Sequence, residues 1–317
     1  MQFARRSVIA GGAASLLMPS VLKASGEGTS EGFATLSRGR VWWRRVGSSD
    51  RTPLLVLHGG PGAGHDYLEP LADLARVRPV IFYDQLGCGR SDKPEDQSLW
   101  TMDYFVREID ELRDVLDLRE VLLFGHSYGG WLAQEYMRSG KNARSVRSLI
   151  LASPSGSVAE FADGAARLLG RLPGNLDQRR RELESSGQTA SPAYQNIVQK
   201  FYDAFLVHVD QPPEYLLRTF ENIASSRNYG VMNGPSEFSV TGNLQTWDGR
   251  GSLSSISVPT LVLTSEWDEV TLDCHERLHA AIKRSVLRVI PKARHLAMVE
   301  KPAAYNEILG QFIEGRV

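Results

Sequence analysis

The chain has 317 residues, of which 42% are hydrophobic, so it can bury the core of one large domain or of one domain with an insertion. Its 36 lysine and arginine residues nearly balance 37 aspartate and glutamate residues, and the net charge is −1. Such a balance supplies no basic field for nucleic acid or anionic lipid. We therefore expect neither a nucleic-acid partner nor stable membrane association.

The first 28 residues have the order of a secretory signal. The pair Arg5-Arg6 precedes an apolar or small-residue run over residues 7–21, and Ala24 leads into a Ser/Gly/Glu spacer. The run is too short to span a bilayer, and the arginine pair partly resembles signals of proteins that are exported already folded. We expect residues 1–28 to be a signal peptide and the protein to be periplasmic or secreted. A loosely docked N-terminal arm is the alternative.

Beyond residue 32, short apolar runs alternate with amphipathic stretches. Most runs are continuously apolar, as expected for strands covered on both faces. Helical patterns occur at residues 102–117, 131–137 and 303–315. The alternation predicts an α/β fold, with a mostly parallel central sheet and helices on both faces. The predicted strands are residues 41–46, 54–60, 79–85, 121–125, 148–154, 260–266 and 286–291.

One long interval departs from this alternation. Residues 156–248 are polar and helix-prone, and the strand pattern returns only after them. A helical insertion between two strands, above the carboxyl ends of the sheet, would act as a lid. We therefore predict a core formed by residues 33–155 and 249–317 and a helical cap formed by residues 156–248.

The two cysteines, Cys88 and Cys274, lie far apart in the sequence. Two isolated thiols make neither a disulfide framework nor a metal-ligand pattern, although they could pair in an oxidising compartment. We expect two unpaired, partly buried thiols. No motif in the chain calls for a metal or another cofactor.

A candidate nucleophile lies where a buried strand gives way to a helix. Residues 125–129, "GHSYG", fit the pattern G-x-S-x-G in the strand–turn–helix context that this pattern requires. The turn is so tight that Gly125 and Gly129 must lack a Cβ, and it lifts the Ser127 hydroxyl above the sheet. A glycine-rich turn with an incidental serine is the alternative. The pattern favours the α/β-hydrolase fold.

A serine hydroxyl needs a base to remove its proton, and that base must itself be oriented. In this fold the chain order is serine, acid, histidine. Two later strand ends supply Asp268 in "SEWDEVT" and His295 in "KARHLAM". Asp268 would hold the imidazole, and His295 would move the proton between Ser127 and the leaving group. Glu266 and Glu269 are rivals for the role of the acid.

The oxyanion that forms during acyl transfer needs hydrogen-bond donors. The glycines of "LHGGPGAGHDY" allow a close backbone approach to a substrate oxygen. We predict the Gly60 N–H and the Tyr128 N–H as the two donors. His58, His65 and His126 are more simply explained as structural residues that brace these loops than as a second base.

Several motifs resemble one family in their order and spacing. The stretches "HGGPG", "YDQLGCGRSD", "GHSYGG", "MNGPSEF" and "SEWDEVT", with an "RH" near the end, are similar to those of the proline iminopeptidases, which are α/β hydrolases. Bacterial amino-acid amidases that act on prolinamide look similar too. The resemblance covers roughly residues 35–315, including the cap.

The resemblance implies a role for five residues. It places the nucleophile, acid and base at Ser127, Asp268 and His295. Two family glutamates that grip the free α-amine of the substrate correspond to Glu237 and Glu269. Two convergent carboxylates would hold an ammonium through charge-assisted hydrogen bonds and would reject a blocked N-terminus. The alternatives are that Glu237 is a surface residue of the cap and that Glu269 is an ordinary neighbour of the acid.

This chain departs from the family beside the nucleophile. Many members carry a tryptophan there, in patterns such as G-G-S-W-G, whereas here the flanking residues are His126 and Tyr128. Many members are also cytosolic, whereas this chain begins with an export-like segment.

The leading hypothesis is a metal-free serine exopeptidase that releases N-terminal residues, preferably proline, from short peptides. An amidase acting on prolinamide or other amino-acid amides would use the same residues. An esterase or lactonase would need no paired acids. A ligand receptor on the same scaffold can keep the triad without catalysing a reaction. No pattern in the sequence indicates an oligomeric state.

Overall fold

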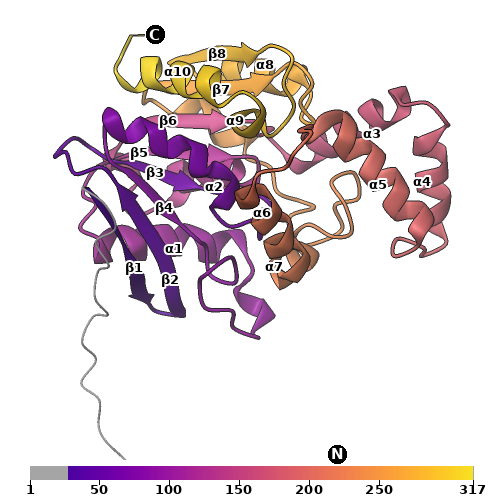
Figure 1. Ribbon diagram of the computed structural model, residues 1–317, viewed down its shortest axis with the longest axis horizontal. Coiled ribbons are helices and arrows are strands. Elements are labelled where there is room, and N and C mark those ends of the chain that lie inside the picture. Colours follow the sequence, from indigo (N-terminus) through magenta and orange to yellow (C-terminus); the bar gives the residue numbers. More distant parts are fainter. Residues whose placement is uncertain (1–27, 317) are drawn as a thin grey trace, which may run out of the picture.

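The computed structural model describes residues 28–316, and an eight-stranded sheet forms their centre (Figure 1). The strand order is β1-β2-β4-β3-β5-β6-β7-β8. β1 pairs with β2, and β2 with β4, in antiparallel fashion, and every other neighbouring pair is parallel. The strands are β1 (Thr29–Leu36), β2 (Gly39–Val46), β3 (Leu54–Leu57), β4 (Val80–Tyr83), β5 (Val121–His126), β6 (Val146–Ala152), β7 (Thr260–Ser265) and β8 (Ser285–Ile290).

The predicted α/β-hydrolase fold and all seven predicted strands are confirmed, and one strand was missed. β1 lies at the edge of the sheet, and only Ala34 and Leu36 in it are buried. An edge strand with so few buried positions and a glycine at residue 32 carries a weak apolar signal. The predicted signal peptide, residues 1–28, lies outside the described residues except for Gly28.

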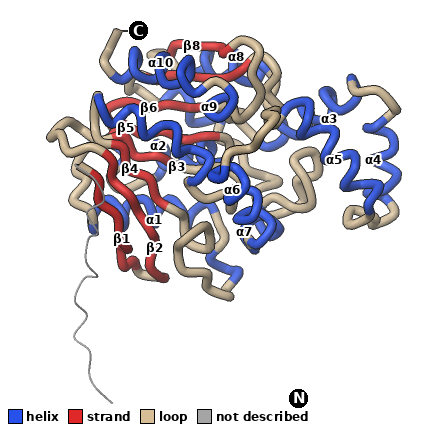
Figure 2. Tube along the Cα trace, in the orientation of Figure 1, coloured by secondary structure: helices blue, strands red, loops and turns tan. Residues whose placement is uncertain are grey.

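Helices cover both faces of the sheet, as Figure 2 shows in blue around the red strands. They are α1 (Met102–Val115), α2 (Tyr128–Ser139), α8 (Leu272–Ala281), α9 (Ala297–Glu300) and α10 (Pro302–Ile313), together with a 3₁₀ segment at Asp66–Arg76. Successive strand residues point to opposite faces. Leu55 and Leu57 accordingly join the core cluster under α1 and α2, whereas Leu54 and Val56 join the cluster under the 3₁₀ segment and α10.

Five α-helices lie between β6 and β7 in the chain; the earlier ones extend beyond the sheet at the right of Figure 1, and the last two lie closer to the sheet. They are α3 (Val158–Arg171), α4 (Leu176–Ser185), α5 (Pro192–Phe205), α6 (Glu214–Ser225) and α7 (Arg227–Met232). We call the segment that carries these helices, residues 156–248, the cap. α6 docks on the core through Arg218, which donates hydrogen bonds to Asp66 Oδ1 and Glu69 Oε1, both at 2.6 Å.

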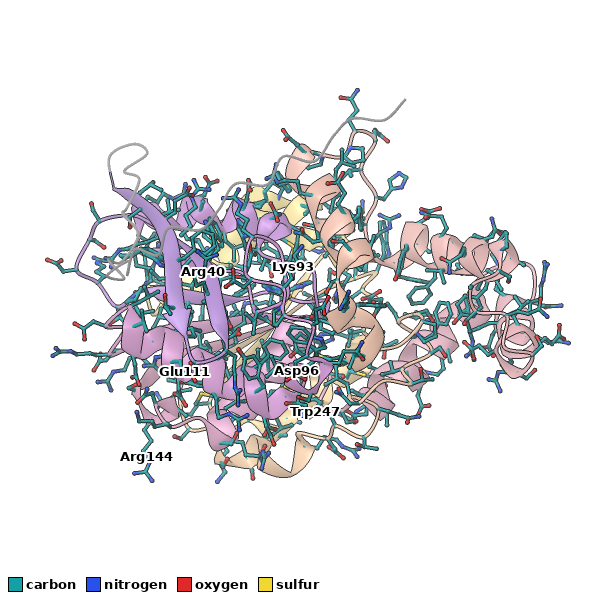
Figure 3. The ribbon with its side chains drawn as sticks, turned by 90° about the horizontal axis from the view of Figure 1, so that it is seen from below. Arg40, Lys93, Asp96, Glu111, Arg144 and Trp247 are labelled. Atoms are coloured by element: carbon teal, nitrogen blue, oxygen red, sulfur yellow. The ribbon has the colours of Figure 1, made fainter. Side chains whose placement is uncertain are left out.

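The chain returns from the cap to the core beside a pair of stacked tryptophans. Trp247, labelled in Figure 3, packs on Trp131 of α2 with the ring centroids 5.6 Å apart. Its indole N–H donates to Glu135 at 3.3 Å. This contact fixes the end of the cap segment against the helix that follows the candidate nucleophile.

Both cysteines, Cys88 and Cys274, are free thiols, as predicted, and they are fully rather than partly buried. Within the described residues, no helix is both long and apolar enough to cross a membrane.

Candidate active site

The turn between β5 and α2 presents Ser127 at the carboxyl edge of the sheet. Ser127 has φ 55° and ψ −124°, a conformation that costs free energy and that the surrounding packing must hold. A Cβ at Gly125 would collide with the carbonyl oxygen of Gly129, and a Cβ at Gly129 would collide with that of Leu57. The predicted need for glycine on both sides of the serine is confirmed.

The candidate base and acid are in direct contact. His295 Nδ1 lies 2.7 Å from Asp268 Oδ1, and both side chains are almost completely buried. Asp268 also accepts hydrogen bonds from the Val270 N–H and, at its other oxygen, from the Ser153 hydroxyl at 2.6 Å. Burial alone raises the pKa of Asp268, but His295, His275 and the Ser153 hydroxyl outweigh it and lower the pKa to about 2.

Neither rival acid occupies this position. Glu266 accepts a hydrogen bond from the Lys292 N–H on the protein surface. Glu269 lies on the other side of the imidazole, where its Oε1 is 3.3 Å from His295 Nε2. Asp268 is therefore the carboxylate placed to orient the ring through Nδ1.

Ser127 and His295 line one cavity of about 330 Å³ beneath the cap. Among the described residues, no hydrogen bond joins Ser127 Oγ to His295 Nε2, and that nitrogen lies 3.3 Å from Glu269 Oε1. Hydrogen bonds between catalytic groups are often loose in a free enzyme and tighten when the substrate binds. The serine and the base thus share the cavity, and the proton path between them is not yet closed.

The cap holds the loop that carries His295. The N–H groups of His295 and Leu296 donate to the carbonyl oxygens of Phe205 and Leu206, both at 2.9 Å. Since Phe205 ends α5, a displacement of the cap would also displace the base.

The predicted oxyanion donors lie on two loops that meet at Ser127. Tyr128 is the first residue of α2, where the N–H groups have no partner within the helix and the helix dipole favours negative charge. Gly60 lines the cavity. The neighbouring Gly59 N–H is already engaged, because it donates to the Tyr67 hydroxyl at 2.8 Å.

The predicted bracing histidines are indeed structural. His58 bridges the Gly59 carbonyl and the Gln85 N–H, and His65 lies 2.8 Å from Asp84 Oδ1. His126 bridges the Tyr67 hydroxyl and the carbonyl of His295.

Both predicted amine-binding glutamates line the cavity that holds Ser127, although Glu237 comes from the cap and Glu269 from the core. Glu237 Oε1 accepts a hydrogen bond from the Tyr229 hydroxyl at 2.7 Å. Glu269 is 2% exposed, and its Oε2 has no hydrogen-bond partner among the described residues. Burial raises the pKa of each carboxyl group. A buried carboxylate oxygen without a partner is costly, and a cation in the cavity would remove that cost.

Sequence reasoning missed two residues that support this site. Ser153 follows β6 at the same sheet edge as Ser127. Its position at the end of a predicted strand could have identified it from the sequence. Tyr229 lies in α7, and no pattern around it indicates that its hydroxyl reaches Glu237.

Comparison with known proteins agrees with this geometry. Residues 52–302 match the α/β-hydrolase fold family, so the chain is a member of that family. Comparison with individual proteins identifies a narrower family within this fold. The proline iminopeptidase of Saccharolobus solfataricus is 40% identical over 288 residues, which cover 90% of this chain and 92% of that protein. The chain therefore belongs to the proline iminopeptidase family.

Two further relatives support this assignment. The proline iminopeptidase of Heyndrickxia coagulans is 35% identical over 89% of this chain and 98% of its own length. The crystal structure of the Mycobacterium smegmatis proline iminopeptidase is 28% identical, with a TM-score of 0.83 over 90% of this chain and 98% of that one.

Proposed function

We propose that the protein is a serine aminopeptidase that releases N-terminal residues, preferentially proline, from short peptides. One observation carries the proposal: Glu237 and Glu269 share a cavity with Ser127, and a buried oxygen of Glu269 lacks a partner. An apolar hydrolase pocket for esters has no use for two buried carboxylates. An ammonium group next to the scissile carbonyl satisfies both. Relatives named proline iminopeptidase over about 90% of the chain support the same conclusion.

Binding comes first in the proposed mechanism. The α-ammonium of the substrate lies between Glu237 and Glu269 and donates charge-assisted hydrogen bonds to them. The ammonium takes the place of His295 beside Glu269. His295 Nε2 is then free to accept the Ser127 proton. The ring of an N-terminal proline packs against the mainly apolar remainder of the wall, which includes Val198, Phe220 and Ile223 among others.

Acyl transfer follows. Ser127 Oγ attacks the carbonyl carbon while His295 takes its proton, and Asp268 stabilises the imidazolium. The N–H groups of Gly60 and Tyr128 hold the oxyanion. His295 then protonates the leaving amine. Water hydrolyses the acyl-enzyme by the same route in reverse.

The test compares three substrates on the wild type and on Glu269→Ala. Prolyl-naphthylamide carries the free amine, N-acetyl-prolyl-naphthylamide lacks it, and a short acyl ester does not need it. At a pH where His295 is neutral in both enzymes, we expect only the first substrate to lose turnover, with kcat/KM falling roughly 10- to 100-fold, or about 1.5–3 kcal/mol, in the variant. Glu266→Gln is the matched control, because that carboxylate faces the surface.

Ester turnover that exceeds prolyl turnover and persists in Glu269→Ala would instead identify an esterase or lactonase. An amidase would use the same residues to release ammonia from prolinamide. Rates with the dipeptide Pro-Gly and with prolinamide separate the two activities. Ser127→Ala should abolish all turnover, whereas a receptor would keep its ligand response.

We also propose that the protein is exported. The arginine pair, the apolar run and the small-residue spacer within residues 1–28 support this proposal. Fractionation of cells that express the full chain is the test. Recovery of the uncleaved protein in the cytoplasm would contradict it.

A further inference from the structure

We propose that Tyr67 and His126 are positioning residues that form one buried hydrogen-bonded relay joining the oxyanion loop, the nucleophile turn and the base. The inference rests on the proposed serine-hydrolase function, because it assigns the relay to the same three loops. Neither residue takes part in the proposed proton transfers or in amine binding.

The relay has three consecutive hydrogen bonds. The Gly59 N–H donates to the Tyr67 hydroxyl at 2.8 Å, and that hydroxyl lies 2.9 Å from His126 Nδ1. On the far side of the ring, His126 Nε2 lies 3.1 Å from the backbone carbonyl oxygen of His295. Tyr67, His126 and His295 are each at most 2% exposed, so water does not compete for these bonds.

Chemistry fixes the direction of every bond. A carbonyl oxygen can only accept, so His126 must carry its proton on Nε2. Nδ1 of the neutral ring is then an acceptor, and the Tyr67 hydroxyl donates to it. The tyrosine oxygen in turn accepts from Gly59. The relay therefore requires one tautomer of His126 and one orientation of the Tyr67 hydroxyl.

The neutral state that the relay needs is also the one the surroundings favour. Burial, followed by the nearby His295, lowers the pKa of His126 to about 3. With both ring nitrogens engaged, His126 has no site left for exchanging a proton with substrate. This arrangement distinguishes a positioning role from that of a second base.

Gly59, His126 and His295, which the relay joins, each lie within one peptide bond of a proposed reacting residue or are that residue. Gly59 precedes Gly60, whose N–H is a proposed oxyanion donor, and His126 precedes Ser127. The third anchor is the backbone of the base itself. The oxyanion loop is rich in glycine and has few side chains of its own to hold it. Since a misplacement of about 1 Å can cost 10²-fold in rate, a cross-link between these loops bears directly on kcat.

The first experiment needs no variant. The ¹⁵N spectrum of the histidine rings in the intact protein distinguishes a protonated from an unprotonated ring nitrogen. We expect His126 to carry its proton on Nε2 throughout the neutral pH range. A signal from the Nδ1-protonated tautomer, or from a cationic ring at neutral pH, would overturn the relay.

The second experiment uses Tyr67→Phe, His126→Leu and the double variant. We expect kcat to fall roughly 10- to 100-fold with KM changed less than about threefold, and the double variant to be no slower than the worse single variant. His126→Gln keeps a donor for the His295 carbonyl and should recover much of the loss. Tyr305→Phe is the matched control, because Tyr305 is equally buried and its hydroxyl has no partner among the described residues.

A loss of kcat in the double variant equal to the product of the two single losses would contradict a relay. An unchanged kcat in Tyr67→Phe would contradict it too. The rate of Ser127 phosphonylation by a neutral organophosphonate is measured in parallel. If the wild type reacts with the phosphonate but turns over no prolyl substrate, the proposed function fails. The phosphonylation rates of the variants then still test the relay.

Discussion

His295 Nε2 lies 3.3 Å from Glu269 Oε1, on the opposite side of the ring from the 2.7 Å contact between His295 Nδ1 and Asp268. The imidazole is thus flanked by two buried carboxylates. Burial alone lowers the pKa of His295, but Glu269 and Asp268 outweigh it and raise the pKa above its usual value. The free enzyme therefore holds its base protonated over more of the neutral range than an isolated histidine would be.

The first prediction concerns the pH dependence of Ser127 reactivity. A protonated imidazole cannot accept the serine proton, so reactivity is lost as the pH falls through the pKa of His295. Glu269→Gln removes a charge that raises this pKa. The acidic limb of the curve of Ser127 reactivity against pH should therefore move to lower pH. The measurement is the rate of inactivation by a neutral organophosphonate, which has no amine to bind Glu269.

Glu266→Gln is the control for this shift, since it removes a nearby carboxylate that does not face the ring. Its acidic limb should coincide with that of the wild type. An unchanged limb in Glu269→Gln would mean that Glu269 does not control the protonation of His295.

The second prediction concerns the identity of the acid. Asp268→Asn keeps the shape of the side chain but no longer stabilises the imidazolium or selects the right tautomer, so kcat should fall about 10⁴-fold. Glu266→Gln should change kcat less than twofold. Single-turnover rates with prolyl-naphthylamide measure both. Comparable losses in the two variants would remove Asp268 from its assigned role.

The order of motifs was enough to predict the triad because each member follows a strand of a parallel sheet. The carboxyl ends of such strands meet at one edge, so chain order and strand assignment bring Ser127, Asp268 and His295 together. The contact between His295 and Glu269 could not be read in this way. It depends on side-chain directions within a loop, and these have no period in the sequence.

Contacts within the cap, and contacts between the cap and the core, were equally hidden. Tyr229 reaches Glu237, and Arg218 reaches Asp66, only because irregular connections set the cap helices at particular angles. β1 was missed for a related reason, since its pairing with β2 is satisfied mainly by backbone groups and buries few side chains.

The third prediction concerns the nucleophile turn. A Cβ at Gly129 would collide with the carbonyl oxygen of Leu57 in the neighbouring strand. Gly129→Ala should therefore lower the free energy of unfolding by about 1–3 kcal/mol and reduce kcat as Ser127 shifts. Gly170→Ala is the control, because nothing lies within 4 Å of a Cβ there and the residue is helical. Its stability, followed by urea unfolding, should stay constant or rise by up to about 1 kcal/mol.

The fourth prediction concerns the attachment of the cap. Arg218 of α6 holds Asp66 and Glu69, and Asp66 is almost completely buried. Arg218→Met keeps most of the aliphatic stem but removes the charge, so the two carboxylates lose their cationic partner. Because Arg218 is about one-third exposed, the expected loss of stability is modest, about 1–2 kcal/mol.

The effect on catalysis should be larger than the effect on folding. α6 also supplies Phe220 and Ile223 to the cavity wall. When α6 loosens, these two side chains therefore lose their fixed positions in the pocket before the core unfolds. We expect KM for Pro-Gly to rise several-fold and amide hydrogen exchange to accelerate in α6 but not in β5. Arg119→Met, which removes an arginine from a fully surface-exposed pair with Asp117, should change neither quantity. Uniform acceleration of exchange across both elements would show that Arg218 stabilises the whole fold rather than the cap.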